Sequence, residues 1–246
     1  MNRTNIDWVM NPDGSKGFTW NPVVGCKNNC WYCYARKFAK RQKCELCKTF
    51  TPHLHGERLD DPSKHKKPAT IFIGSMCDLW GDWVDEHWID LVLDVVRACP
   101  QHTFLALTKN PRRYLDFDIP ENMWCGVTVT GDGDPRWDDF FLCLPSPQQK
   151  KFISFEPLLS PTKEICKAFD YCGSAIDLDQ IIIGPLNHKE RVTKREWILN
   201  LTNIVPDGVP VWHKSGCEKQ GLLQAHEMRR ELAWTAPHEA REGERC

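Results

Sequence analysis

The chain has 246 residues, in which 32 lysines and arginines nearly balance 33 aspartates and glutamates. With 41% hydrophobic residues the composition excludes a disordered chain, and the length suits one α/β barrel-sized domain or two small ones. No stretch approaches the roughly 18–20 uninterrupted apolar residues of a membrane span, and residues 1–8 lack the apolar region of a secretory signal. We therefore expect a cytoplasmic protein with no membrane partner.

Short apolar runs recur along the chain and alternate with segments of helical periodicity. The predicted strands are residues 18–24, 70–74, 103–107, 124–129, 151–155, 180–184 and 209–212. The predicted helices are residues 31–43, 86–98, 135–144, 162–172 and 194–204, with a short turn after Pro111. Runs such as Ile181-Ile182-Ile183 are continuous rather than alternating, as in strands covered on both faces. This order predicts a parallel α/β sheet, open or closed into a barrel.

Two segments fall outside this alternation. Residues 43–67 are polar and rich in proline, histidine and lysine, which predicts an insertion or a long loop. Residues 218–246 are highly charged, which predicts a tail with one amphipathic helix and a frayed end. We therefore predict one domain over residues 1–217, followed by the tail.

Polar residues follow every predicted strand. They include Cys26, the run from Ser75 to Asp78, the run from Thr108 to Asn110, Thr130, Glu156, His188 and Lys214. Ligands of parallel α/β folds gather at the carboxyl ends of the strands. The sequence therefore predicts a site at this mouth.

Cysteines are the most informative residues at this mouth. The chain has 13 of them, an odd number that makes a poor disulfide framework. Cys26, Cys30 and Cys33 form a C-x3-C-x2-C loop directly after the first strand. Three thiolates in one tight loop can hold three irons of a [4Fe–4S] cubane, which leaves the fourth iron open to a ligand.

This spacing, with Tyr32 directly before the last cysteine, resembles the cluster motif of the radical S-adenosylmethionine (SAM) superfamily. The resemblance implies a partial (β/α)6–7 TIM-like barrel with parallel strands and a [4Fe–4S] cluster bound by Cys26, Cys30 and Cys33. It further implies that the open iron binds SAM, and that one electron cleaves SAM to a 5′-deoxyadenosyl radical. That radical would abstract a hydrogen from a substrate, and a ferredoxin- or flavodoxin-type partner would supply the electron.

Longer segments are similar to a phage- and prokaryote-encoded radical-SAM-like family of uncharacterised function. They are residues 19–26 (TWNPVVGC), 55–59 (HGERL), 75–80 (SMCDLW), 107–111 (LTKNP) and 155–159 (FEPLL). The resemblance implies a three-Cys-motif partner protein and a more distant relation to spore photoproduct lyases. The chain departs from the family in its short cysteine spacer, in Cys77 where serine is usual, and in Gly184-Pro185-Leu186 where Gly-Gly-Glu is common.

The resemblance also suggests residues that contact the cofactor. Ser75 and Asp78 would face the methionine amine, and Lys109 would meet the methionine carboxylate as a point charge. Tyr32, or its neighbour Trp31, would pack against the cluster or the adenine edge. Thr128 and Thr130 point to the same side of their strand and would face the adenosine.

Two residues are candidates for catalysis, each with a structural alternative. Cys77 would return a hydrogen atom to a substrate radical, because the S–H bond is weak, or it is a small buried cysteine. Glu156 ends an apolar strand, where an unpaired carboxylate is costly. It would bind ribose hydroxyls or substrate, or it would pair with a neighbouring lysine.

The metal assignments also have alternatives. The three-cysteine loop would instead bind zinc if Cys44 or a histidine supplied a fourth ligand. Cys44 and Cys47, followed by His53 and His55, offer four ligands for a second metal, which would pin the insertion. The short spacing between the two pairs is unlike a zinc finger, which favours a loop with incidental thiols.

Basic residues suggest a substrate class. They gather at residues 36–41, 64–67, 112–113 and 189–195, with Trp31, Trp80, Trp83 and Trp137 nearby in sequence. Basic groups beside aromatic rings suit phosphates and stacked bases, so a nucleotide or nucleic acid is a candidate substrate. The net charge of −1 gives no overall electrostatic footprint for duplex DNA. The alternative function is a non-enzymatic zinc or iron–sulfur module that binds nucleic acid.

Overall fold

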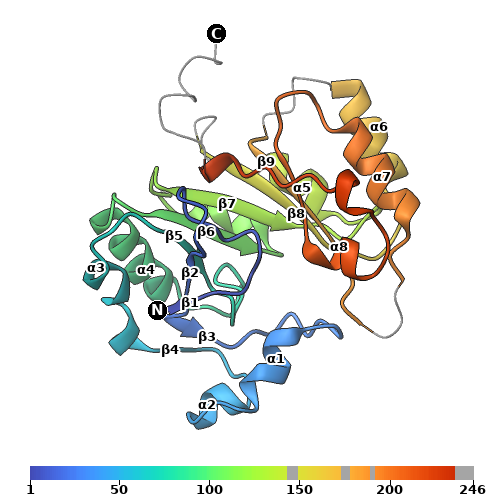
Figure 1. Ribbon diagram of the computed structural model, residues 1–246. Coiled ribbons are helices and arrows are strands. Elements are labelled where there is room, and N and C mark those ends of the chain that lie inside the picture. Colours follow the sequence, from blue (N-terminus) through green and yellow to red (C-terminus); the bar gives the residue numbers. More distant parts are fainter. Residues whose placement is uncertain (143–148, 173–177, 189–191, 236–246) are drawn as a thin grey trace.

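The computed structural model describes residues 1–142, 149–172, 178–188 and 192–235 (Figure 1). Its centre is an eight-stranded sheet in the order β1-β2-β5-β6-β7-β8-β9-β10. These strands are β1 (Asn2–Arg3), β2 (Phe18–Trp20), β5 (Thr70–Ile73), β6 (Thr103–Thr108), β7 (Met123–Thr128), β8 (Lys151–Leu158), β9 (Gln180–Pro185) and β10 (Val211–His213). All neighbours pair in parallel except β1, which runs antiparallel to β2.

The strands from β2 to β10 follow one another in the sheet as they do along the chain, and the sheet is not closed. This arrangement confirms the predicted α/β fold with parallel strands and is compatible with a partial TIM-like barrel. Strands of this sheet that are consecutive in the chain are neighbours in the sheet, because each crossover connection returns the chain to the next position.

Helices connect the strands where helical periodicity predicts them. They are α1 (Tyr34–Ala39), α4 (Glu86–Ala98), α5 (Arg136–Leu142), α6 (Lys163–Cys172) and α7 (Arg195–Ile204), with the 3-10 helix η2 (Pro111–Asp116) after β6. Helix α4 has the predicted bounds because the Asp85 side chain accepts a hydrogen bond from the backbone N–H of His87 and caps it. Helix α1 is shorter than the predicted 31–43, since the cysteines before it lie in a loop.

Alternating side chains of the strands build two cores. On the outer face Ile71, Ile73 and their equivalents pack against the helices. On the inner face Phe72 and its counterparts on the next four strands form a second cluster. Trp8, from the N-terminal segment, and Trp234 pack on this inner cluster, with ring centroids 6.0 Å apart. Both faces of the sheet are therefore covered, which explains the continuous apolar runs in the sequence.

The insertion, residues 43–67, is built of short regular elements. It contains α2 (Glu45–Lys48), β4 (His53–Leu54), η1 (Gly56–Arg58) and α3 (Asp61–Lys64). Strand β4 pairs antiparallel with β3 (Val23–Val24), which lies outside the main sheet. The predicted strand 18–24 is thus two strands, divided at Asn21 and Pro22, because proline cannot donate a ladder hydrogen bond.

The described part of the C-terminal segment packs on the sheet. It contains α8 (Ser215–Lys219) and the 3-10 helices η4 (Ala225–Glu227) and η5 (Ala233–Thr235), while the predicted frayed end falls largely outside the described residues. Leu232 and Trp234 are buried in the inner cluster. No helix within the described ranges is both long and apolar enough to cross a membrane.

Candidate active site

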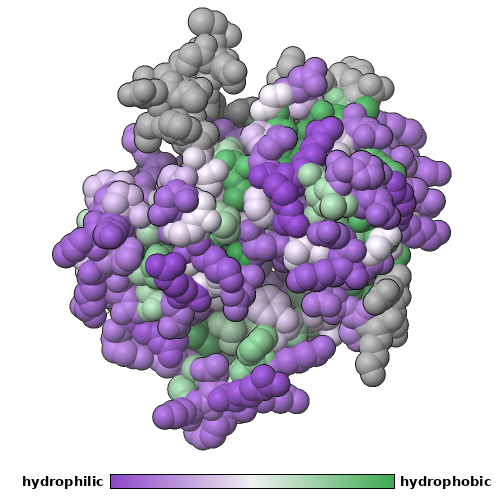
Figure 2. Space-filling view, in the orientation of Figure 1, coloured by the Kyte–Doolittle hydropathy of each residue, from purple (hydrophilic) through white to green (hydrophobic). Residues whose placement is uncertain are grey.

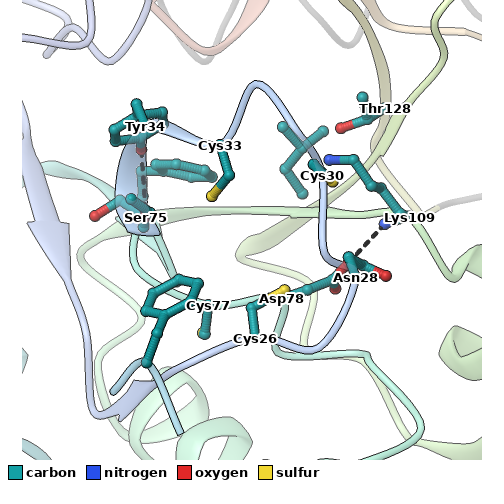
Figure 3. Close-up of a pocket in the computed structure, with 15 residues that line it drawn as sticks. Cys26, Asn28, Cys30, Cys33, Tyr34, Ser75, Cys77, Asp78, Lys109 and Thr128 are labelled. Carbon is teal, nitrogen blue, oxygen red and sulfur yellow. Dashed lines mark hydrogen bonds between the residues drawn. The ribbon is translucent and has the colours of Figure 1, made fainter. Parts of the chain in front are cut away.

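One pocket collects most of the predicted site residues (Figure 3). Cys26, Cys30 and Cys33 lie around it, and Phe72 and Leu107 of the inner sheet face contribute to its lining. Figure 3 shows Ser75 and Cys77, which follow β5, on the side opposite Lys109 and Thr128, with Asp78 between the two sides. Lys109 follows β6, and Thr128 is at the end of β7. The pocket therefore lies at the carboxyl ends of the parallel strands.

Gly25 fixes the start of the cysteine loop. Its φ of 96° lies in the region that favours glycine, and any Cβ there would lie 2.4 Å from the carbonyl of Thr51. Its backbone N–H donates to the carbonyl oxygen of Met76 over 3.0 Å, and the N–H of Cys26 donates to that of Phe50 over 3.3 Å. The first cysteine is thus held between the end of β5 and the insertion.

Arg36 of α1 holds the loop from the other side. Its guanidinium donates to the Cys26 carbonyl oxygen over 3.3 Å and lies 5.1 Å from the centre of the Phe50 ring. The backbone N–H of Arg36 donates to the Cys33 sulfur over 3.4 Å. The side chains of Ala35 and Phe50 pack against Cys26 and Cys33. The loop therefore has an apolar floor and a fixed backbone.

The distances between the sulfurs of Cys26, Cys30 and Cys33 indicate which kind of metal centre they could bind. Among the described residues, only one group of three or more potential ligands has its ligand atoms, one from each residue, within 4.8 Å of one another. Cys26, Cys30 and Cys33 are not in that group. Ligands of one zinc ion must converge on a single centre. Ligands of a cubane bind three different irons. The wider spacing, the shared pocket and the three thiols therefore fit an iron–sulfur cluster better than a single ion.

Burial controls protonation in this pocket. It raises the pKa of Cys26 to about 11, and the nearby Asp78 charge adds to that effect. Burial also raises the pKa of Cys77 well above its ordinary value, again helped by Asp78. Both groups are therefore thiols at neutral pH unless a metal takes the proton.

Asp78 is a structural centre of the site. It is 5% exposed, and its carboxylate accepts three hydrogen bonds. The donors are the Asn28 side chain at 2.8 Å, the Thr108 hydroxyl at 2.7 Å and the backbone N–H of Lys109 at 2.9 Å. Asp78 thus ties the cysteine loop to the ends of β5 and β6. This bonding makes it a positioning residue, and because Asp78 also lines the pocket, its predicted contact with the cofactor stays a prediction.

Ser75 is held by residues that the sequence did not single out. The Asn21 amide donates to the Ser75 hydroxyl over 3.0 Å and accepts from the backbone N–H of Met76 over 2.9 Å. The Tyr34 hydroxyl donates to the Ser75 carbonyl oxygen over 2.9 Å. Asn21 follows β2 and directly precedes Pro22, and this position is the signal by which the sequence could have identified it as a site residue.

Thr128 has a polar neighbour on the inner face. In the β7–β8 register it lies opposite Ser154, which is fully buried. The Ser154 hydroxyl has no hydrogen-bond partner among the described residues. Ser154 shares its face with Glu156 because side chains alternate along a strand. That alternation was the sequence signal for Ser154.

Glu156 forms an ion pair with a neighbouring lysine, which is the structural alternative predicted for it. Its carboxylate accepts a hydrogen bond from the Lys214 ammonium, and neither side chain is more than 29% exposed. Burial alone would lower the pKa of Lys214, but the Glu156 charge raises it overall. A Cβ on Gly184 would lie 2.8 Å from Cδ of Lys214 and 3.2 Å from Cγ of Glu156, so this glycine makes room for the pair. Glu156 is not among the residues that line the pocket.

Tyr32 is likewise absent from the lining of the pocket, where Tyr34 is found instead. Its ring stacks edge-on against Trp31, with centroids 5.5 Å apart. Burial raises its pKa, with contributions from the nearby Cys30. Tyr32 therefore lies beside the second cysteine, and its predicted contact with the cluster or adenine stays a prediction.

A second metal-type group lies in the insertion. Cys44, Cys47, His53 and His55, here called the Cys2His2 group, place one ligand atom each within 4.8 Å of one another. The sequence favoured incidental thiols at these positions. The fold brings them together because α2 and β4 are joined by a tight turn, in which the N–H of Phe50 donates to the carbonyl oxygen of Cys47 over 2.9 Å.

The aromatic and basic residues separate into buried and exposed sets. Trp80 is buried, and Arg113 is 8% exposed and donates to backbone carbonyls, so neither belongs to a recognition surface. The exposed rings are Trp31, Tyr34 and Phe38, at 56%, 52% and 51% exposure. They alternate with basic residues on α1 and its flanks. In Figure 2 the region of α1 and α2 is largely hydrophilic, with a hydrophobic area directly above it. Part of the basic run 189–195 lies outside the described residues.

Comparisons with known proteins give one family model and two solved structures, of which the first described below agrees with this fold. A family model described as "Protein of unknown function (DUF5131)" matches residues 3–234. No curated protein sequence matches the chain. Spore photoproduct lyase complexed with dinucleoside spore photoproduct is similar in structure, with a TM-score of 0.50 and 10% identity over 84% of this chain. A cysteine-to-serine mutant of spore photoproduct lyase gives a TM-score of 0.48 and 12% identity over 68% of this chain. The chain spans 65% and 55% of the lengths of these two structures.

Proposed function

The chain belongs to the DUF5131 family of proteins of unknown function, and we propose that it is a radical SAM enzyme. Cys26, Cys30 and Cys33 would hold a [4Fe–4S] cluster in the pocket, with one iron left for SAM. When bound, the cluster supplies the electron that cleaves SAM to the carbon radical that abstracts a hydrogen atom from the substrate.

The observation that carries the proposal is the placement of three thiols around one pocket at the carboxyl end of a partial parallel barrel. The thiols do not converge as ligands of a single ion would. The backbone at the first cysteine is fixed by the hydrogen bond from Gly25 to Met76, after the end of β5, and by the one from Cys26 to the insertion. A cluster bound here would face the inner side of the sheet, which is a protected place for a reactive radical.

The chain offers groups for each part of SAM. The Lys109 ammonium, in the lining of the pocket, would meet the methionine carboxylate as a point charge. Ser75 is fixed by Asn21 and would contact the amine. Thr128 would face the adenosine, together with the Ser154 hydroxyl, which has no hydrogen-bond partner in the described part of the chain. Cys77, held as a thiol, is retained as a candidate hydrogen-atom donor, and Tyr32 as a contact of the cluster or adenine.

The proposed substrate class is a nucleotide or nucleic acid. Trp31, Tyr34 and Phe38 present exposed rings next to the pocket, and Lys37, Lys40 and Arg41 are exposed on the same helix and the turn after it. Arg41 lies over the Phe38 ring at 5.6 Å. Such a surface suits stacked bases and phosphates. The structurally similar lyase was solved with a dinucleoside, which agrees with this class. The Glu156–Lys214 pair at the same end of the sheet is a candidate polar contact for the substrate.

The proposal implies partners. A ferredoxin- or flavodoxin-type reductant would supply the electron, and a three-Cys-motif partner protein remains a prediction. The ten cysteines whose side chains the structure describes are all free, as in a reducing compartment. The cytoplasm is therefore the proposed location.

The experiment is anaerobic purification followed by iron and sulfide analysis of the chain and two variants. We expect about four irons per chain in the wild type, loss of that iron in Cys30→Ala, and retention in Cys166→Ser. Cys166 is a matched control because it is a free cysteine outside the pocket. The reduced wild type should convert SAM to 5′-deoxyadenosine, and Cys30→Ala should not.

The surface of α1 also favours a second candidate, a non-enzymatic module that binds nucleic acid. A chain that holds a metal and binds single-stranded oligonucleotide, yet never yields 5′-deoxyadenosine, would be such a module. Under either function, Trp31→Ala should weaken oligonucleotide binding, because stacking contributes about 1–3 kcal/mol per base.

A further inference from the structure

We propose that the Cys2His2 group binds a single zinc ion, which fastens the insertion beneath the three-cysteine pocket. The proposal does not depend on the function proposed above, because the two sites share no ligand. It rests on the distances between ligand atoms, on the second partners of the two histidines and on the contacts of the segment between them.

The distances are those of ligands around one ion. The sulfur of Cys47 lies 3.5 Å from Nε2 of His53 and 3.2 Å from Nε2 of His55, and the Cys44 sulfur lies 3.6 Å from Nε2 of His53. Zinc bonds of about 2.3 Å to sulfur and 2.0–2.1 Å to nitrogen, at a tetrahedral angle, place the two atoms about 3.6 Å apart.

The same distances argue against a two-iron cluster. In a [2Fe–2S] centre with two cysteines and two histidines, the histidines replace cysteines on one of the two irons. The cysteine sulfurs and histidine nitrogens then bind different irons. Here they lie as close as ligands of one centre, and tetrahedral S2N2 coordination by one ion is typical of zinc.

The second nitrogen of each histidine has the partner that metal sites use. Nδ1 of His53 lies 2.8 Å from the Thr51 carbonyl oxygen, and Nδ1 of His55 lies 2.8 Å from the Glu57 carboxylate. Both partners only accept, so each Nδ1 carries the proton in the neutral ring and each Nε2 has a free lone pair.

The two Nε2 atoms face each other at 2.9 Å. Two lone pairs at that distance repel unless a proton or a cation lies between them. A zinc ion would satisfy both, and two thiolates would balance its charge to give a neutral site. The partly buried position of the group suits such a neutral centre.

The segment fastened by this group is the floor of the cysteine pocket. Phe50 follows Cys47 by three residues, lines the pocket and accepts the hydrogen bond from the N–H of Cys26. Its φ of 58° is unusual for a non-glycine residue. Thr51 approaches Gly25 so closely that no side chain fits there. Zinc would therefore fix the backbone that positions the first cysteine.

The test is metal analysis of the full chain, purified anaerobically, together with variants of each site. We expect about one zinc per wild-type chain, a loss of roughly fivefold or more in His55→Ala, and retention in His55→Cys, because cysteine is also a zinc ligand. Cys30→Ala should keep its zinc, and Cys166→Ser is the matched control. Cobalt in place of zinc should give the visible spectrum of a tetrahedral site with thiolate ligands.

A second readout tests the structural role. Hydrogen exchange at the amides of Phe50 and Thr51, which are bonded to carbonyls of the α2 turn, should accelerate about tenfold or more when zinc is removed. A wild-type chain that takes up neither zinc nor cobalt, or His55→Ala with full zinc, would overturn the assignment. Iron bound by the Cys2His2 group of the Cys30→Ala variant would also overturn the zinc assignment. Absence of iron from the wild type would defeat the proposed enzyme and leave the zinc site intact.

Discussion

Asp78→Asn tests how the site is held together. The carboxylate of Asp78 is 5% exposed and accepts three hydrogen bonds, from Asn28, Thr108 and Lys109. The oxygen Oδ2 takes two of them. An asparagine can keep its one carbonyl oxygen on these two donors, but its NH2 group then faces the Thr108 hydroxyl, which must turn to accept.

The magnitude follows from this change. One charge-assisted hydrogen bond of about 1.5–3 kcal/mol is lost or reversed, and the other two become neutral and weaker. We expect the free energy of unfolding to fall by about 2–4 kcal/mol. For a chain of this size that is a decrease in Tm of roughly 5–10 °C. Because Asn28 belongs to the cysteine loop, the iron content of the reconstituted protein should fall as well.

Two assays check this prediction, namely urea unfolding followed by circular dichroism and iron analysis after reconstitution. Asp90→Asn is the matched control, since Asp90 is exposed on α4. If Asp78→Asn loses less than about 0.5 kcal/mol and binds iron as the wild type does, Asp78 is not the structural centre described above.

Three further predictions concern other parts of the chain. Burial, and then the charges of two arginines, lower the pKa of His213 to about 4. As the pH falls from 6.5 to 4, the unfolded chain therefore takes up a proton on this histidine before the folded chain does. Urea titrations over this pH range should show the wild type losing up to about 3 kcal/mol of its free energy of unfolding relative to His213→Gln. A Cβ at Gly126 would lie 2.2 Å from the Phe152 ring, so Gly126→Ala should cost about 1–3 kcal/mol in thermal unfolding, whereas Gly56→Ala, with nothing within 4 Å, should cost far less. The Cys77→Ser variant should bind as much iron as the wild type in iron analysis, because Cys77 is not a proposed cluster ligand. Loss of iron in this variant would contradict the ligand assignment.

Most of the fold could be predicted because it depends on local periodicity. The strands alternate with helices in the predicted order, and α4 has the predicted bounds. The insertion was harder, since its elements are only two to four residues long and give no periodic signal. The path of residues 220–235 depends on Leu232 and Trp234 packing on the inner cluster, which is a long-range contact that composition does not show.

The site was predictable where residues are adjacent in sequence. The cysteine spacing and the strand ends identified Cys26, Cys77, Lys109 and their neighbours, which the pocket brings together. Spatial partners could not be predicted in the same way. Asn28 reaches Asp78 across 50 residues of sequence, and Lys214 reaches Glu156 across 58. The Cys2His2 group was visible as a pattern, but only the turn between α2 and β4 shows that its ligand atoms converge.

The most direct test of the central claim is reductive cleavage of SAM by the cluster-loaded chain. The reduced wild type and Cys166→Ser should both form 5′-deoxyadenosine and methionine, and Cys30→Ala should form neither above background. Retained cleavage in Cys30→Ala would contradict the ligand assignment. A wild-type chain with a full cluster and no 5′-deoxyadenosine under any reductant would contradict the enzymatic function itself.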